Sequence, residues 1–187
     1  MSSGVLVTGF EPWADHVVNP SQLVAEALGG VVLPVSWARA TAALRAAIDE
    51  HDPEIVIAFG LAETREAISV ERFAHNLDEA ATTDNDAASG SGAEIDPAGP
   101  IALRSTLPVD AIVAELTAEG IPAEVSRDAG GFLCNHVFYR LLQLRAGGFV
   151  HVPPLDVLPA ETLVRAAELI VARSRGTSPS RATSTSG

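Results

Sequence analysis

The chain carries a single cysteine, Cys134, at a point where a helix is expected to begin. Gly130 and Gly131 mark a turn just before it, and an apolar periodic stretch, 132–144, follows. Unpaired amide N–H groups and the positive end of the helix dipole favour a thiolate in the first turn of a helix. A lone thiol in a chain with histidines elsewhere is a candidate nucleophile, although most free cysteines are small buried side chains.

Two further residues could complete a catalytic set with this thiol. His151 ends a short apolar run, where a histidine needs a polar partner, and Glu71 lies within a strand-like segment that disfavours glutamate. In a Cys–His–Glu set the histidine accepts the thiol proton, the carboxylate orients the ring, and the thiolate attacks a carbonyl. Taken singly, His151 is also compatible with a core histidine, and Glu71 with an edge residue or a salt bridge to an arginine.

Short apolar segments alternate with helical patterns along the chain. Strands are expected at 5–8, 31–35, 55–59, 68–74, 123–126 and 149–152. Helices are expected at 20–28, 38–50, 108–119, 132–146 and 159–174, with Asn19 and Pro20 opening the first. This alternation predicts an α/β layered fold with a mainly parallel sheet, in which ligands gather at the carboxyl ends of the strands.

The remaining segments set the domain organisation. The polar stretch 76–100 is expected to be a long loop. A length of 187 residues suits one domain, which we place at 1–174. The Ser/Thr/Gly-rich tail 175–187 is expected to be disordered.

Composition excludes several classes of function. The net charge of −12 argues against a nucleic-acid partner and against an anionic membrane surface. The chain has no lysine, which excludes Schiff-base chemistry on a protein lysine. The scattered histidines show no ligand-pair spacing, so no metal site is expected. With no signal peptide seen and one unpaired thiol, we expect a cytoplasmic protein.

Several segments together resemble a known family, pyroglutamyl peptidase I. They occur in the family's order: Gly9-Phe-Glu-Pro-Trp13, Val17-Val-Asn-Pro-Ser21, Ile68-Ser-Val-Glu-Arg72 with Asn76, Asp84-Asn85, Ala129-Gly-Gly-Phe-Leu-Cys-Asn-His136 and Phe149-Val-His-Val-Pro153. The resemblance covers roughly residues 4 to 173. The cysteine and histidine segments are specific in combination, whereas each alone is a weak signal.

The resemblance implies a fold, an activity and a set of roles. The fold would be a three-layer α/β/α sandwich around a twisted, mainly parallel mixed sheet. The activity would be removal of an N-terminal pyroglutamyl residue from peptides, with no metal or organic cofactor. Cys134 would be the nucleophile, His151 the general base and then acid, and Glu71 the residue that orients the histidine. The resemblance also allows a homo-oligomer, either a dimer or a tetramer.

The same resemblance implies a substrate pocket and exposes departures from the family. Phe10, Trp13, Asn19 and Leu61 are expected to line the pocket, with Trp13 larger than the usual phenylalanine and Leu61 in place of a usual glutamine. Ala81 stands where many members carry an arginine near the developing oxyanion. Candidate substitutes are Arg72 and the amide N–H groups that open the Cys134 helix. These departures leave open a second function, a lactam-binding protein of the same fold with little turnover.

Overall fold

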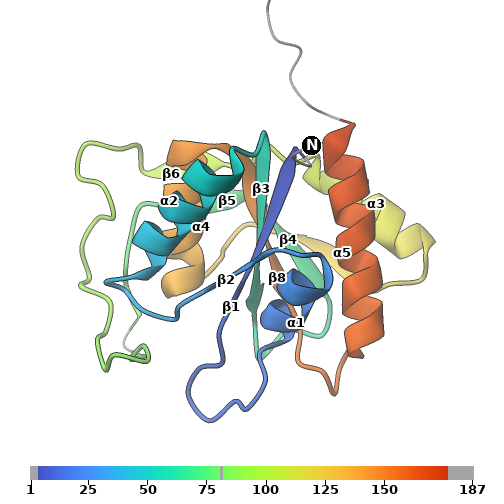
Figure 1. Cartoon of the computed structure of the whole chain (residues 1–187), viewed down its shortest axis with the longest axis horizontal. Helices are drawn as coiled ribbons and strands as arrows, with labels where there is room; N and C mark the ends of the chain where they lie inside the picture. The colour runs from blue at the N-terminus through green and yellow to red at the C-terminus, as the bar shows by residue number, and fades with distance from the viewer. Residues whose placement is uncertain (1–3, 81, 177–187) are drawn as a thin grey trace, which may run out of the picture.

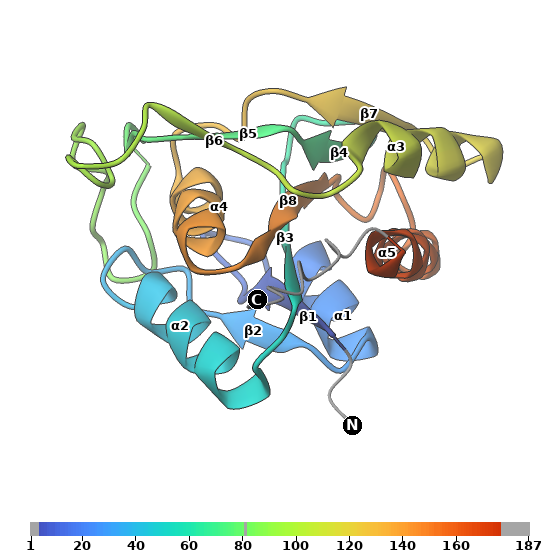
Figure 2. The ribbon, with the colours of Figure 1, turned by 90° about the horizontal axis from the view of Figure 1, so that it is seen from above.

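A twisted sheet of six strands forms the centre of the molecule in a computed structural model that describes residues 4–80 and 82–176. Its strands are β1 (Val5–Phe10), β2 (Val31–Leu33), β3 (Ile55–Leu61), β4 (Ile68–Glu71), β7 (Ala123–Ser126) and β8 (Ala146–Val152). Their order across the sheet is β2-β1-β3-β8-β4-β7. Figure 1 shows the sheet between its flanking helices, and Figure 2 shows the strand order from β2 to β7. Neighbouring strands run parallel, except that β4 and β8 pair antiparallel. The predicted mainly parallel mixed sheet is therefore confirmed.

Helices cover both faces of this sheet. They are α1 (Pro20–Ala27), α2 (Ala40–His51), α3 (Val109–Ala118), α4 (Leu133–Leu144) and α5 (Ala160–Arg175). Helices α1, α3 and α5 pack on one face, and α2 and α4 pack on the other (Figure 2). Along β3, the side chains of Ile57 and Phe59 enter the hydrophobic core beneath α1, α3 and α5. Those of Val56 and Ala58 enter the core beneath α2 and α4. Because β3 is buried on both faces, its sequence is a continuous apolar run rather than an alternating one.

The start of α1 follows from its capping residue. The side-chain oxygen of Asn19 accepts hydrogen bonds from the backbone N–H of Ser21 at 3.0 Å and from its hydroxyl at 2.8 Å. Pro20 occupies the first helical position, where its missing N–H costs nothing. The predicted helix start at residue 20 is confirmed, and it fixes the loop that carries Trp13.

The segment expected as one strand at 68–74 is two strands that belong to different sheets. β4 ends at Glu71, and β5 (Phe73–His75) pairs antiparallel with β6 (Ala102–Arg104) in a separate small sheet. The sequence does not indicate β6, because its three residues become a strand only through pairing with β5 across the long loop. The break leaves Glu71 at the end of its strand, at the edge where a site can form.

The segment 76–100 is a long loop, as expected, but polar contacts hold it against the body of the protein. Asp84 is buried and accepts hydrogen bonds from the backbone N–H groups of Trp37, Asp86 and Ala88. The indole N–H of Trp13 donates to the carbonyl of Thr83 at 2.8 Å. The loop therefore braces one wall of the region around Trp13.

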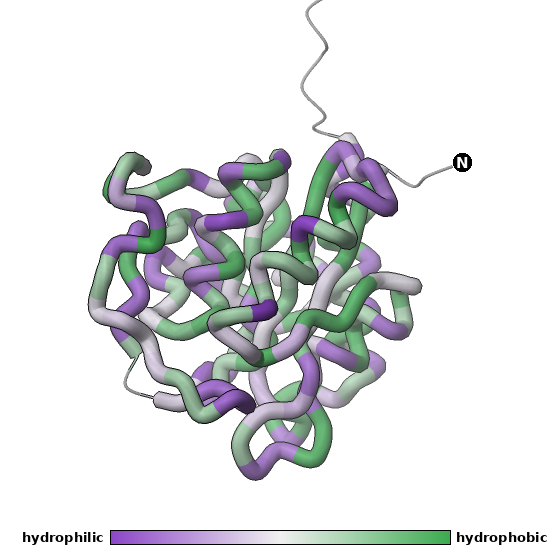
Figure 3. The backbone as a smooth tube through the Cα atoms, turned by 60° about the vertical axis from the view of Figure 1, so that its left-hand side comes forward, coloured by the Kyte–Doolittle hydropathy of each residue, from purple (hydrophilic) through white to green (hydrophobic). Residues whose placement is uncertain are grey.

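The helices carry hydrophilic and hydrophobic residues along their length, as amphipathic helices of a layered fold do (Figure 3). Across residues 4–80 and 82–176, none of the helices combines the length and the apolar character needed to span a membrane. Helix α5 ends at Arg175, and most of the tail predicted to be disordered, residues 177–187, lies outside the described residues.

Candidate active site

Glu71 and His151 meet inside the sheet because their strands are antiparallel neighbours. The register pairs Ser69 with His151, so Glu71 lies two residues farther along β4. The Nδ1 atom of His151 lies 2.7 Å from Oε1 of Glu71. Glu71 is fully buried and His151 is 4% exposed. An ionised carboxylate only accepts, so we assign the proton to Nδ1, which leaves Nε2 with a lone pair that can take up a proton.

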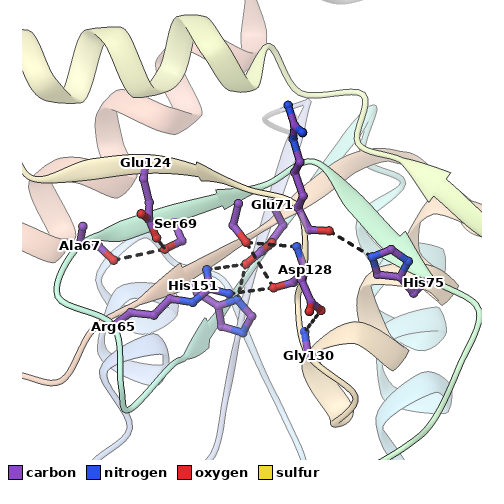
Figure 4. A network of polar contacts seen from close by, with 11 residues as sticks. Arg65, Ala67, Ser69, Glu71, His75, Glu124, Asp128, Gly130 and His151 are labelled. Atoms are coloured by element: carbon purple, nitrogen blue, oxygen red, sulfur yellow. Dashed lines mark hydrogen bonds and ion pairs between the residues drawn. The ribbon is translucent and has the colours of Figure 1, made fainter.

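An arginine that sequence reasoning missed balances the buried carboxylate. Arg65 donates from Nη1 to the same Oε1 of Glu71 at 2.7 Å and from Nη2 to the carbonyl of Asp128 at 2.8 Å. Figure 4 shows Arg65 and His151 converging on Glu71. A carboxylate with no exposure needs a cation close by, and that requirement was the signal for an arginine partner. Glu71 thus has both the salt bridge considered for it and the contact with His151.

The surroundings keep His151 neutral. Burial lowers the pKa of His151, and the positive charge of Arg65 lowers it further, against the opposing effect of Glu71. Because Arg65 already compensates Glu71, the imidazole does not have to carry a charge to satisfy the carboxylate. A neutral imidazole whose Nδ1 is held by a carboxylate is suited to act as a base through Nε2.

Cys134 lies in the first turn of α4, as predicted, and its sulfur approaches the same strands. A Cβ atom added to Gly60 would lie 2.8 Å from Sγ of Cys134, so the thiol packs directly over this glycine. Gly60 pairs with His151 in the β3–β8 register. β3 runs on to Leu61, beyond the predicted end at residue 59, because this pairing continues through its last residues. The fold therefore brings Cys134, His151 and Glu71 to one end of the sheet.

The thiol itself is not activated in the resting protein, which corrects the expectation from the sequence. Burial raises the pKa of Cys134 to about 12, and the negative charge of Glu71 adds to the rise. The backbone at the helix start and Arg65 act in the opposite direction and do not overcome it. The helix position was predicted correctly, but desolvation outweighs the helix dipole. The resting pair is thus a neutral thiol and a neutral imidazole.

A small pocket of about 50 Å³ opens beside Cys134. The four residues predicted for it, Phe10, Trp13, Asn19 and Leu61, all line it. Sequence reasoning missed the other contributors besides Cys134: His16, Val35, Glu63, Phe132 and Leu133. The ring of Phe132 lies 5.1 Å from that of Trp13, measured between centroids. The pocket is therefore a largely aromatic and aliphatic slot that ends at the thiol.

Neither Asn19 nor Leu61 presents an unpaired hydrogen-bond acceptor to this pocket. Asn19 uses its oxygen to cap α1 and its amide nitrogen to bond the carbonyl of Glu11 at 3.0 Å. Leu61 presents only an apolar side chain. Asn19 therefore shapes the wall of the pocket, and its two polar groups are held by the protein itself.

Arg72 does not supply the oxyanion donor considered for it. It donates to Asp110 of α3 at 2.6 Å and is absent from the pocket lining. Ala81, the other position of interest, lies outside the described residues. The backbone N–H groups of Leu133 and Cys134 remain as candidate oxyanion donors. The first N–H groups of a helix have no partner within it, and Phe132 provides no side-chain cap.

Asn135 and His136, the two residues after Cys134, anchor the start of α4 to neighbouring segments. Asn135 is fully buried and bridges His75 and Leu77 through its side-chain amide. His136 contacts Asp78 through Nδ1 at 2.9 Å. These contacts lock the start of α4 to the strand and loop that follow Glu71. In the part of the chain that the structure describes, no cluster of three or more histidine, cysteine or acidic side chains is suited to hold a metal ion.

Comparison with known proteins places this arrangement in context. The family model described as "Pyroglutamyl peptidase" matches residues 3–168. The pyrrolidone-carboxylate peptidase of Gloeobacter violaceus is 47% identical over 168 residues, which cover 81% of this chain and 82% of that protein. The corresponding protein of Klebsiella pneumoniae is 44% identical over 174 residues, covering 84% of this chain and 81% of the other.

Solved structures agree with the sequence comparison. The crystal structure of pyroglutamyl peptidase I from Bacillus amyloliquefaciens superposes with a TM-score of 0.87 at 34% identity, covering 92% of this chain and 96% of the other. The pyrrolidone carboxyl peptidase of Thermococcus litoralis gives a TM-score of 0.88 at 36% identity, covering 92% and 93%. The match therefore spans nearly all of each chain.

Proposed function

This chain belongs to the pyroglutamyl peptidase family, and we propose that it is a cysteine exopeptidase that removes N-terminal pyroglutamyl residues from peptides. Cys134 is the nucleophile, His151 the general base and acid, and Glu71 the residue that orients His151. The observation that carries the proposal is the buried contact between Glu71 and His151 at 2.7 Å. Cys134 packs over Gly60, which pairs with His151 in the sheet. An apolar pocket opens at the same thiol.

Acylation begins with both partners neutral. Nε2 of His151 takes the proton of Cys134 as Sγ attacks the carbonyl carbon that joins the pyroglutamyl residue to the next residue. The carbonyl electrons move onto oxygen and return when the C–N bond breaks. The leaving amine takes the proton from Nε2, and a pyroglutamyl thioester remains on Cys134.

Deacylation uses the same groups in the second half of the cycle. Nε2 of His151 removes a proton from water while the water oxygen attacks the thioester carbon. The C–S bond breaks, Sγ regains the proton, and pyroglutamate leaves. Glu71 holds the ring through Nδ1 in both halves and supports its transient positive charge.

The first amides of α4 stabilise the oxygen that becomes negative in each step. The N–H groups of Leu133 and Cys134 point out of the helix start, where the helix dipole also favours negative charge. In this proposal they stand in for the arginine that many family members carry at the position of Ala81. Since one lost oxyanion donor costs about a hundred- to a thousand-fold in rate, we expect slower turnover than in members that retain the arginine.

The pocket favours a neutral lactam over a charged N-terminus. Phe10, Trp13 and Leu61 surround the ring with apolar surface, and the one acid among the lining residues, Glu63, is engaged by His16. An ammonium group would lose its hydration there without an available counter-charge, which is worth a discrimination of about a thousand-fold or more.

Amide substrates that differ only in the first residue test this function. Purified protein should cleave pyroglutamyl amides and should cleave prolyl, glutaminyl and glutamyl amides at least about a thousand-fold less well. Comparable turnover of prolyl and pyroglutamyl amides would reject the lactam pocket. No turnover of any amide, with measurable binding of pyroglutamate, would support the alternative of a lactam-binding protein.

The same proposal covers the cellular setting. We infer a cytoplasmic protein from the single unpaired thiol, which a reducing compartment preserves. A dimer or tetramer remains a prediction, and sedimentation of the purified chain measures it directly.

A further inference from the structure

Two loops that both contribute residues to the pocket lining are joined by a side-chain contact. His16 ends a turn in which its backbone N–H bonds the carbonyl of Trp13. Glu63 lies in a second turn, closed by the bond from the N–H of Arg65 to the carbonyl of Ala62. Nε2 of His16 is hydrogen-bonded to Oε1 of Glu63, although the two residues are 47 positions apart.

Both members of this contact also line the pocket. The pocket walls include Trp13 from the first loop and Leu61 from the second, next to His16 and Glu63 themselves. The contact therefore joins two side chains that both belong to the pocket lining. The side chains keep 37% and 49% of their surface exposed, so the bridge lies at the mouth rather than in the core.

We propose that the His16–Glu63 bridge sets the width of the pocket and so restricts it to a five-membered lactam ring. This inference rests on the proposed function and deepens it, because it names the residues that select ring size. The bridge holds the Trp13 loop against the Leu61 loop. Without it the two walls can separate, and a ring with one more methylene can enter beside Cys134.

The expected size of the effect follows from the cost of one methylene. An apolar pocket discriminates for or against one methylene by about ten- to two-hundred-fold. An exposed side-chain contact of this kind adds little to stability, so breaking the bridge should leave the fold intact. Breaking the bridge should therefore reduce the selectivity between ring sizes and leave folding unchanged.

Two substrates measure this choice directly. They are the pyroglutamyl amide and its homologue with a six-membered lactam. Glu63→Ala and His16→Ala should each raise the relative kcat/KM of the six-membered substrate by about ten-fold or more. The double variant should do no more than either single variant, because the two side chains act as one unit. His16→Gln, which can still donate to Glu63, should restore part of the selectivity.

Matched controls separate the bridge from a general effect of charge. Asp15→Ala changes an exposed acid in the turn of His16, and Glu66→Ala changes one in the segment after Glu63. Neither residue lines the pocket, so neither change should alter the ratio between the two substrates. An unchanged ratio in Glu63→Ala, or additive effects of the two bridge substitutions, would overturn the proposal.

A second measurement keeps this inference apart from the proposed function. If the wild-type protein cleaves no pyroglutamyl amide, the proposed function fails. The inference is then judged by protection of Cys134 from alkylation at alkaline pH. Pyrrolidone should protect the wild type at least about ten-fold better than piperidone does, and Glu63→Ala should remove this preference. Equal protection of the wild type by both rings would overturn it.

Discussion

Two histidine–glutamate pairs lie near Cys134, and they differ in burial and in consequence. His151 and Glu71 are sealed inside the sheet, with Arg65 completing the charge balance. His16 and Glu63 join two loops at the pocket mouth and keep about two-fifths to one-half of their side-chain surface exposed. The proposals above therefore assign the same two residue types to proton transfer in one place and to pocket shape in the other.

Burial explains the difference between the two pairs. A buried carboxylate must be compensated, so any change at Glu71 or Arg65 alters the electrostatics felt by His151. Water solvates both members of an exposed pair whether or not they are in contact. Substitutions there therefore lower the stability of the fold by little more than the value of the contact itself. We therefore expect substitutions in the first pair to change the catalysed reaction, and substitutions in the second pair to change the choice of substrate.

Removing the imidazole of the buried pair should have the largest effect. His151→Ala takes away the group that accepts the thiol proton, and burial leaves that proton on sulfur. The kcat for a pyroglutamyl amide should fall by about ten-thousand-fold or more. The matched change at the mouth, His16→Ala, should cost less than about ten-fold on this substrate. Similar losses in both variants would erase the distinction between the pairs.

Neutralising the buried carboxylate should have a smaller effect. Glu71→Gln keeps the size of the side chain but loses the charge that supports the protonated imidazole, so kcat should fall by roughly a hundred-fold. Glu63→Gln is the control for the same chemical change in an exposed setting. Wild-type activity in Glu71→Gln would make Glu71 a structural partner of Arg65 and reduce the site to a Cys134–His151 dyad.

The charge balance around His151 predicts opposite shifts of the pH profile. Arg65 lowers the pKa of His151, so Arg65→Gln should raise it and move the acid limb of kcat/KM to higher pH. Glu71 raises that pKa, so Glu71→Gln should move the acid limb to lower pH. Profiles of kcat/KM measured from about pH 4 to 8 give the direction of each shift. Thermal unfolding checks that each variant is folded. Shifts in the same direction would contradict the network described here.

The smallest effect concerns Asn19 in the wall of the pocket. Asn19→Ala removes the cap of α1 and should lower the free energy of unfolding by about 1 kcal/mol, measured with urea. Gln22→Ala, in the same helix but away from the cap, is the control and should cost less. If stability is unchanged while KM rises, Asn19 reads the substrate, and its assignment as a purely structural wall residue is wrong.

Much of the buried site is predictable from the sequence, because its elements carry local signals. The turn before Cys134, the cap at Asn19 and the apolar run that ends at His151 each follow from short-range chemistry. Strand β6 forms only through pairing with β5 across the long loop, and no local pattern indicates it. Arg65 lies six residues before Glu71, but their contact follows from the burial of Glu71, which arises only in the folded chain. The thiol pKa was predicted in the wrong direction because the helix dipole is a local feature, whereas burial and the charge of Glu71 arise only in the folded chain.

If Cys134 is the nucleophile, it must become acylated during turnover. A pyroglutamyl ester with a good leaving group makes hydrolysis of the thioester the slower step, so acid quenching traps the intermediate. Mass spectrometry of the digested protein should show one pyroglutamyl group on the peptide that contains Cys134. The adduct should be absent from Cys134→Ala, which should be inactive but folded. Turnover by Cys134→Ala, or an adduct on another residue, would contradict the account.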